Sequence, residues 1–184
     1  MVISAQQAQQ VYETAEQIYS LAEVEEALDR IAGEISSRLA DTEPLVLPVM
    51  NGALIPAGRI LSRLNFPLRQ DYIHVTRYRE TTKGGSLTWV RKPAIPLMGR
   101  TVLIIDDILD EGHTLEALVK ACREMGAAAV YSAVLCEKEH DRGSDIKADF
   151  LALKVPDRYV FGSGMDYKGY LRNAPGIFAI KGGG

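Results

Sequence analysis

The sequence predicts an α/β protein in which helices flank a central, mostly parallel sheet. Two observations lead to this fold class. Short apolar runs rich in β-branched residues recur along the chain, and such runs are typical of buried parallel strands. Several of them are followed by a glycine-bearing turn and a segment with helical spacing. With 184 residues the chain can bury one full core but is too short for two ordinary domains, so we expect a single domain, 1–184.

The N-terminal segment 1–40 is expected to form two helices. A weak helical pattern extends as far as Tyr19, and Ser20 with Glu23 forms a capping-box pattern that would start the second helix. Apolar residues follow at helical spacing and predict a buried stripe: Val24, Leu28, Ile31, Ile35 and Leu39. We expect these helices to pack on the sheet or on a partner subunit.

The next two strands are predicted at Leu45–Val49 and Asp71–Thr76. The first is followed by M-N-G-A and a helix, which on the residues alone is an ordinary βα unit. The second is followed by the polar, basic and glycine-bearing segment Arg77–Lys92. Two interpretations of this segment stay open. It is either a surface hairpin, in which Ser86–Val90 pairs with the preceding strand, or a mobile lid over a site.

The stretch T-V-L-I-I-D-D-I-L-D-E-G-H-T is the most informative part of the sequence. Val102–Ile105 is predicted as a buried strand, and the adjacent acids Asp106 and Asp107 end it. Thr114 is expected to open an amphipathic helix, and Gly126 stands where a helix C-cap would. The apolar face of this helix comprises Leu115, Leu118, Val119 and Cys122.

A turn of this kind lies at the carboxyl edge of a parallel sheet, where open α/β proteins bind ligands. Free N–H groups at the helix start favour an anion, and Gly112 would let the backbone approach it. Acids beside a phosphate would repel it unless they hold a divalent metal or accept bonds from hydroxyl groups. Asp106, Asp107 and Asp110 therefore suggest a ligand with a phosphate, a diol and bound Mg²⁺. A plain turn with solvated acids is the competing interpretation, whereas a Walker loop and a dinucleotide fingerprint are excluded by the missing glycine motifs.

Further strands are predicted at Ala129–Leu135, Asp149–Val155 and Ile177–Ile180. Lys138 follows the first of them, where it is either a solvated strand end or faces the ligand crevice. The segment V-P-D-R-Y-V-F-G-S-G-M-D-Y-K-G-Y follows the second, and on the residues alone it is a loop with packed aromatic side chains.

Composition argues against several classes of protein. The net charge of −3 gives no bulk attraction to nucleic acid, and no apolar run approaches the roughly 20 residues of a membrane helix. Cys122 and Cys136 lie among apolar residues without metal-binding spacing, so we expect buried free thiols. No basic region followed by an apolar one is present at the start, so no signal peptide is seen and we expect a cytoplasmic protein. From the net charge and the short apolar runs we expect neither nucleic-acid nor membrane partners.

The run D-D-I-L-D-E-G-H-T after V-L-I-I resembles the phosphoribosyl diphosphate (PRPP) motif of the type I phosphoribosyltransferases. The closest likeness is to their hypoxanthine-guanine branch, and it covers most of the chain from about Leu45 on. The resemblance implies a single-domain type I phosphoribosyltransferase fold, with a flexible lid loop at 77–92 and a small purine-binding hood at 137–175. It also implies purine salvage, in which the 5-phosphoribosyl group of PRPP is transferred to N9 of hypoxanthine or guanine with release of pyrophosphate, in the presence of Mg²⁺.

The resemblance assigns most of the PRPP site. Asp106 and Asp107 would accept hydrogen bonds from the ribose hydroxyls and bind Mg²⁺, and Asp110 would be the general base at N7 of the purine. Backbone N–H groups of the phosphate loop would hold the 5-phosphate, while a second loop, often with a cis peptide, and an arginine would contact pyrophosphate. The members of this PRPP-binding set are Glu111, Gly112, His113, Thr114, Asn51, Gly52 and Arg172.

Two positions depart from the family pattern. The family usually has Lys or Arg where Asn51 stands, so the pyrophosphate contact here is expected from backbone and amide groups only. It commonly has Ser or Thr where Glu111 stands, so this carboxylate must point away from the phosphate. Arg77 and Tyr78 match the start of the family's lid.

The purine site is likewise implied by the resemblance. Lys138 would donate to the 6-oxygen of the base, and because an ammonium group has donors only, it favours a 6-oxo over a 6-amino purine. Tyr159 would stack on the purine, and the backbone of Val160 would read its edge. Asp166 would lie near the 2-position of the base and bind a second Mg²⁺.

Three other readings of the sequence remain. One is a xanthine-preferring enzyme of the same fold, and another is a PRPP-sensing regulator. A regulator should add a DNA-binding domain or a basic RNA face, whereas this chain has neither net basic charge nor spare length. A purely structural domain would leave the coincidence of these acids and Lys138 without a reason. Family habit suggests a homodimer or homotetramer.

Overall fold

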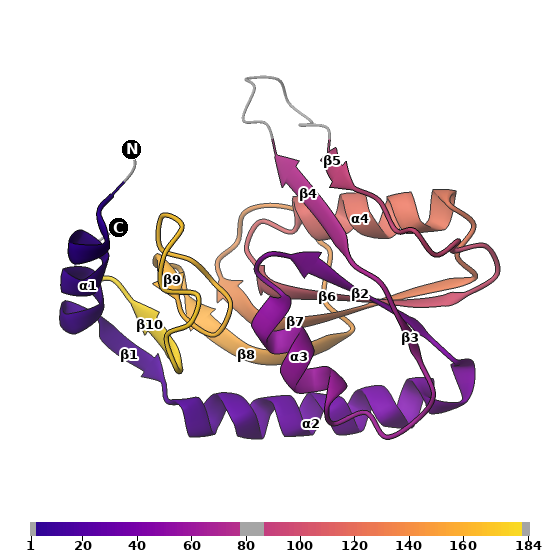
Figure 1. The fold of residues 1–184 in the computed structure, drawn as a ribbon, viewed down its shortest axis with the longest axis horizontal. Helices are drawn as coiled ribbons and strands as arrows, with labels where there is room; N and C mark the ends of the chain where they lie inside the picture. The colour runs from indigo at the N-terminus through magenta and orange to yellow at the C-terminus, as the bar shows by residue number, and fades with distance from the viewer. Residues whose placement is uncertain (1–2, 78–86, 182–184) are drawn as a thin grey trace.

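The computed structural model describes residues 3–77 and 87–181, and it has two β-sheets (Figure 1). The larger sheet has seven strands in the order β5-β4-β2-β6-β7-β8, with β3 paired beside β2. Pairs β4–β2–β6–β7–β8 are parallel and β5 is antiparallel to β4, which confirms the predicted, mostly parallel sheet. Its strands are β2 (Leu45–Met50), β3 (Arg69–Gln70), β4 (Ile73–Arg77), β5 (Leu87–Arg91), β6 (Thr101–Leu109), β7 (Ala129–Glu139) and β8 (Phe150–Pro156).

Helices cover both faces of this sheet, which explains why β2 and the first half of β6 are apolar throughout and fully buried. In Figure 1 the long helix α2 runs along one side and α4 lies on the other. The predicted stripe on α2 is buried, and the Ser20–Glu23 capping box is formed. The helical elements are α1 (Ala5–Thr14), α2 (Leu21–Leu39), the 3₁₀ turn η1 (Ala40–Thr42), α3 (Leu54–Leu61) and α4 (His113–Glu124).

Two helices are present within 1–40 as predicted, but the residues that join them form a strand rather than helix. Helix α1 ends at Thr14, and Glu16–Tyr19 forms strand β1, which pairs antiparallel with β10 (Ile177–Ala179). Ile18 and Tyr19, which carried the helical pattern, pack against the main core from this strand. The strand partner comes from the far end of the sequence, so the local pattern could not reveal it.

The strands of the core motif are longer than predicted. Strand β6 continues through Asp106 and Asp107 to Leu109 by pairing with β7, and β7 continues to Glu139 by pairing with β8. Lys138 therefore lies on a strand rather than after one. Thr114 was also expected to open the helix, but α4 begins one residue earlier, after Gly112, whose φ is +77°.

The smaller sheet, β1-β10-β9, stands beside the main sheet at the end near β8 (Figure 1). Strand β9 (Val160–Phe161) is antiparallel to β10. A separate apolar cluster holds this sheet to α1, in which Phe161 stacks on Phe178 and Tyr12 meets both rings edge-on. The sheet thus anchors the loop that follows β9, which is the C-terminal part of the predicted hood.

Several smaller predictions have plain outcomes. Cys122 and Cys136 are free and buried, and burial raises the pKa of Cys122 to about 11. Strand β5 pairs with β4 as the hairpin interpretation required. Tyr78 and most of the expected lid lie outside the described residues, and Arg77 is the last residue of β4. Within the described ranges, the helices are all too short or too polar to cross a membrane.

Asp71 fastens the start of β4 to the segment after β5. Its carboxylate accepts hydrogen bonds from Arg91 Nη1 at 2.8 Å and from the backbone N–H groups of Tyr72, Ala94 and Ile95 at 2.8, 2.5 and 3.1 Å. The side chain is only 7% exposed. Burial acts to raise the pKa of Asp71, but these four donors outweigh it and lower the pKa to about 2.

We predict that Asp71→Asn lowers the free energy of unfolding by about 1–2 kcal/mol at pH 7, because an amide cannot replace an ionised acceptor of four donors. A depressed pKa stabilises the fold above the unfolded-state pKa of about 3.9. The difference between variant and wild type should therefore shrink as the pH falls from about 4 to about 2. Urea unfolding at a series of pH values measures this. The exposed Asp145→Asn is the control, and an equal loss in both variants would contradict the prediction.

Candidate active site

A cavity of about 730 Å³ opens at the carboxyl ends of β2 and β6, where the sequence predicted a ligand site. Besides Val75 and Val134, it is lined by three parts of the chain that are far apart in sequence. These are residues 49–52 after β2, residues 106–115 from β6 to α4, and Asp166 with Arg172 from the loop after β9. The structure therefore brings together the whole predicted PRPP-binding set and the three predicted metal ligands.

The loop between β6 and α4 has the form of an anion cradle. Gly112 adopts φ +77°, and a Cβ there would lie 2.5 Å from Ser144 Oγ, so a larger residue is excluded. The first intrahelical bond runs from Glu116 N–H to the carbonyl of Gly112 at 2.9 Å. The earlier N–H groups, those of Gly112 to Leu115, have no acceptor within a helix and line the cavity wall.

A segment after β7 supports this loop from behind. Ser144 N–H donates to the carbonyl of Glu111 at 2.8 Å, and Gly143 packs directly on the Glu111 backbone. Arg142 binds both carboxylate oxygens of Asp157 and lies 3.6 Å from Glu111 Oε1 through its Nε. The positive charge of Arg142 thus offsets the negative charge of Glu111, which stands where the family commonly has Ser or Thr.

Asp106 and Asp107 form a partly buried acidic pair in the second half of β6. Burial, and then the neighbouring charge of Asp107, raise the pKa of Asp106 well above its ordinary value. Burial also raises the pKa of Asp107, although a hydrogen bond with Asp106 and the charge of Arg172 act against it. Arg172 Nη1 is 3.7 Å from Asp107 Oδ2, too far for a hydrogen bond. The pair is therefore short of positive charge, which a cation or hydroxyl donors would supply.

The loop after β2 lies against this pair. The peptide bond between Met50 and Asn51 is cis, as the resemblance implied for this loop. A Cβ on Gly52 would overlap the carboxylate of Asp107, and a Cβ on Gly164 would overlap the carbonyl oxygen of Gly52. Glycine is thus required at 52 by the approach of Asp107, and at 164 by the approach of the Gly52 backbone. Among the described residues that line the cavity, Arg172 supplies the guanidinium or ammonium charge.

Asp166 and Arg172 hold each other across the mouth of the hood loop. Arg172 Nη2 donates to Asp166 Oδ1 at 2.8 Å, and Gly169 N–H donates to Oδ2 at 2.7 Å. Arg172 Nη1 also donates to the carbonyl of Gly164 at 2.6 Å. This fixes both side chains at the cavity wall, although the sequence analysis gave them separate roles.

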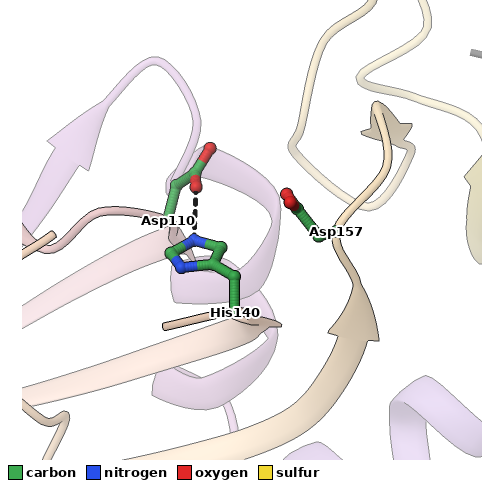
Figure 2. Close-up of side chains that lie close together, drawn as sticks. All are labelled: Asp110, His140 and Asp157. Atoms are coloured by element: carbon green, nitrogen blue, oxygen red, sulfur yellow. Dashed lines mark hydrogen bonds and ion pairs between the residues drawn. The ribbon is translucent and has the colours of Figure 1, made fainter. Parts of the chain in front are cut away.

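Asp110 accepts two hydrogen bonds, of which Figure 2 shows the one from His140. Lys138 Nζ donates to Oδ2 at 2.8 Å, and His140 Nε2 lies 2.8 Å from Oδ1. Burial acts to raise the pKa of Asp110, but the hydrogen bonds from Lys138 and His140 outweigh it and hold that pKa below its ordinary value. The two residues with predicted chemical roles, Asp110 and Lys138, are therefore bonded to each other in this structure.

Asp110, His140 and Asp157 also place one possible ligand atom each within 4.8 Å of one another (Figure 2). The neighbouring cations argue against a metal at this position. Both oxygens of Asp157 are bound by Arg142, and those of Asp110 are bound by Lys138 and His140. We interpret the cluster as a hydrogen-bond network.

The predicted purine-binding residues are less tightly gathered. Lys138 lines a second hollow of about 410 Å³ together with His140 and Lys154. Tyr159 is 44% exposed and meets Tyr167 edge-on, with ring centroids 5.3 Å apart, whereas Val160 is buried in β9. Tyr159 and Val160 line neither of these two hollows.

His140 and Arg142 are the site residues that the sequence analysis missed. His140 is hydrogen-bonded to Asp110, and Arg142 is paired with Glu111. Only the lysine was given a role when the segment C-E-K-E-H-D-R was interpreted from the sequence. A signal was present, because Lys138, His140 and Arg142 alternate with acidic residues and alternate positions of an extended chain share one face.

Comparisons with known proteins agree with this geometry. The family of the phosphoribosyl transferase domain matches residues 14–168. The chain is 34% identical over 160 residues to the hypoxanthine-guanine phosphoribosyltransferase of Bacillus subtilis, covering 86% of this chain and 89% of that protein. It is 28% identical over 165 residues to the hypoxanthine-guanine-xanthine phosphoribosyltransferase of Tritrichomonas foetus, covering 89% and 90%.

Solved structures give the same result. A hypoxanthine-guanine-xanthine phosphoribosyltransferase superposes with a TM-score of 0.82 at 27% identity, covering 90% of this chain and 96% of that one. A hypoxanthine phosphoribosyltransferase from Trypanosoma cruzi, in a ternary complex with substrates, superposes with a TM-score of 0.86 at 26% identity, covering 93% and 98%. With its type I fold and these relatives, the chain belongs to the phosphoribosyltransferase family, in the hypoxanthine-guanine branch.

Proposed function

We propose that this protein transfers the 5-phosphoribosyl group of PRPP to N9 of a 6-oxopurine, hypoxanthine or guanine, forming IMP or GMP and pyrophosphate in purine salvage. One observation carries the proposal. A single cavity joins an anion cradle at the start of α4 to the partly buried pair Asp106 and Asp107, and Asp110 at its edge is bonded to Lys138. Phosphate, diol and base recognition are thus adjacent, in the order that a phosphoribosyl donor and a purine require.

The sugar phosphate accounts for the first half of the cavity. Backbone N–H groups of Glu111 to Thr114 hold the 5-phosphate, and Asp106 and Asp107 accept hydrogen bonds from the ribose 2- and 3-hydroxyls. Burial raises the pKa of both acids, so hydroxyl donors from the ribose would stabilise their ionised forms. Pyrophosphate contacts come from Asn51, Gly52 and Arg172.

Mg²⁺ fits the same acids. Carboxylate oxygens are the ligands that this ion prefers, and Asp106, Asp107 and Asp166 line one cavity. When bound, Mg²⁺ neutralises charge on the departing pyrophosphate. Arg172 lies 2.8 Å from Asp166 and 3.7 Å from Asp107, so its positive charge partly offsets both carboxylates.

The proton transfer depends on a change of partners at Asp110. As C1 of the ribose loses pyrophosphate and bonds to N9, the N7 proton of the purine passes to the Asp110 carboxylate. Lys138 occupies Oδ2 of this carboxylate without substrate. A 6-oxo base draws the Lys138 ammonium to its own oxygen, which frees Oδ2 and removes the main cause of the low pKa of Asp110. An exocyclic amino group has no such effect, because it offers no strong acceptor.

The remaining roles follow from the family likeness. Tyr159 stacks on the base, and its exposed ring leaves room for this. Val160 reads the base edge through its backbone, and Arg77 and Tyr78 begin the lid. A cytoplasmic location and a homodimer or homotetramer complete the proposal. Xanthine is a second candidate substrate, because the relative from Tritrichomonas foetus is named for it.

The first test is an ultraviolet assay of the purified protein with PRPP and Mg²⁺ against hypoxanthine, guanine, xanthine and adenine in parallel. Nucleotide formation with hypoxanthine and guanine, and none with adenine, is expected. Xanthine as the best substrate would keep the mechanism and change the substrate. Failure with all four bases despite tight PRPP binding would overturn the proposal in favour of a regulator.

Asp110→Asn should lower kcat about 10²- to 10⁴-fold, the usual range for loss of a positioned proton acceptor. PRPP binding should change little, because the phosphate cradle and the Asp106–Asp107 pair stay intact. Steady-state kinetics and PRPP calorimetry measure the two effects, with the exposed Asp145→Asn as control. Near wild-type turnover in Asp110→Asn would contradict the assignment of Asp110 as the general base.

Lys138→Met should reduce the preference for hypoxanthine over adenine by about tenfold or more, because the 6-oxygen loses its donor. Competition between the two bases, followed by nucleotide chromatography, gives the ratio of their kcat/KM values. Lys147→Met, at an exposed position after β7, is the matched control. An unchanged ratio in Lys138→Met would refute the assignment.

Gly52→Ala should weaken PRPP binding about tenfold or more, because the new Cβ overlaps Asp107 and must displace it. Gly58→Ala is the matched control, since a Cβ at this helical glycine meets nothing within 4 Å. It should bind PRPP normally and unfold at the same or a higher temperature. Calorimetric titration with PRPP and thermal melts of both variants would show the contrast, and equal affinities would contradict the steric argument.

A further inference from the structure

His140 has a defined place in the site that the proposed function does not use. It directly follows β7, and its side chain is only 7% exposed. Nε2 lies 2.8 Å from Asp110 Oδ1, while the backbone N–H of Arg142 donates to Nδ1 at 3.3 Å. Both ring nitrogens are thus engaged, one by a carboxylate and one by a backbone donor (Figure 2 shows the first).

These two contacts select one protonation state of the ring. An imidazolium, or a neutral ring with its proton on Nδ1, would point an N–H at the N–H of Arg142. The neutral Nδ1–H ring would also direct the Nε2 lone pair at the Asp110 carboxylate. Only the neutral ring with its proton on Nε2 donates to Asp110 and accepts from Arg142.

The bond from His140 gains importance when substrate binds. Asp110 follows the end of β6 in a loop, and its side chain is 42% exposed, so its orientation depends on its partners. Once Lys138 leaves Oδ2 for the base, His140 is the partner within hydrogen-bond distance in the described structure. Arg142 Nη2 is 3.7 Å from Oδ1 and remains bound to Asp157.

We propose that His140 is a positioning residue, which donates from Nε2–H to Oδ1 of Asp110 and keeps Oδ2 directed at the base after Lys138 has moved away. Oδ1 is the protein side of this carboxylate and Oδ2 its ligand side. A neutral donor suits this purpose, because it fixes the carboxylate without adding a positive charge that would weaken it as a base. The proposal rests on the proposed function of Asp110 and Lys138.

Two substitutions separate positioning from simple packing. His140→Ala removes the donor, whereas His140→Gln carries an amide N–H at the same number of bonds from Cα as Nε2. With hypoxanthine, kcat should fall about ten- to hundredfold in the alanine variant, since a hydrogen bond to a charged group has effects of that size. KM for PRPP should stay the same, and the glutamine variant should recover most of the loss.

Spectroscopy tests the tautomer without any turnover. The chain has three histidines, so the ¹⁵N signals of His140 are identified as those missing from His140→Gln. At neutral pH they should show a proton on Nε2 and an unprotonated Nδ1. Because this readout needs no substrate, it stands even if the wild type fails to make nucleotide, a result that would overturn the proposed function instead.

Three results would overturn the role of His140. They are a wild-type kcat in a folded His140→Ala variant, a glutamine variant as slow as the alanine variant, and a ring that carries its proton on Nδ1. A rise in KM for PRPP with unchanged kcat would also count against it, because it would indicate disturbance of the neighbouring phosphate loop. Loss of kcat with recovery by glutamine, together with the Nε2–H signal, would establish it.

Discussion

The parallel pairing of β6 with β7 is the constraint on which the site depends. The two strands stay in register from Thr101 opposite Ala129 to Leu109 opposite Glu137. Asp110 and Lys138, the next residues of the two strands, therefore lie beside each other. A slip of one residue would turn Lys138 to the other face of the sheet and separate the pair. The buried apolar residues of both strands prevent that slip, so the packing of the core fixes the chemistry at its edge.

The site arranges its charges in two groups. The charges of Asp110, Glu111 and Asp157 are matched by those of Lys138 and Arg142, and His140 adds a hydrogen bond to Asp110. Asp106 and Asp107 are only weakly matched, by Arg172 at a distance of 3.7 Å from Asp107. Buried carboxylates without partners are costly, and this cost is recovered when a ligand brings hydroxyl groups or a cation. The acidic pair thus lowers the stability of the protein without ligand at the position where the ligand is proposed to bind.

The elements with a local cause could be predicted from the sequence. The buried stripe and capping box of α2, the alternation of strands and helices, and the acidic turn after β6 all follow from nearby residues. Strand β1 and the full lengths of β6 and β7 could not be predicted, because they depend on partners distant in the chain. The site followed the same division. The core motif identified Asp106, Asp107 and Asp110, whereas His140 and Arg142 act through contacts that only the folded chain creates.

The small sheet has a consequence for how the chain is made. Glu16 pairs with Ala179, so β1 has no partner until more than 150 further residues have been synthesised. Until then β1 has an unpaired edge, and the loop with Asp166 and Arg172 lacks the sheet that anchors it. The main sheet, whose strands pair with nearer neighbours, can form earlier. The loop that completes the cavity wall therefore depends on a strand pair of high sequence separation, which cannot close before β10 has been made.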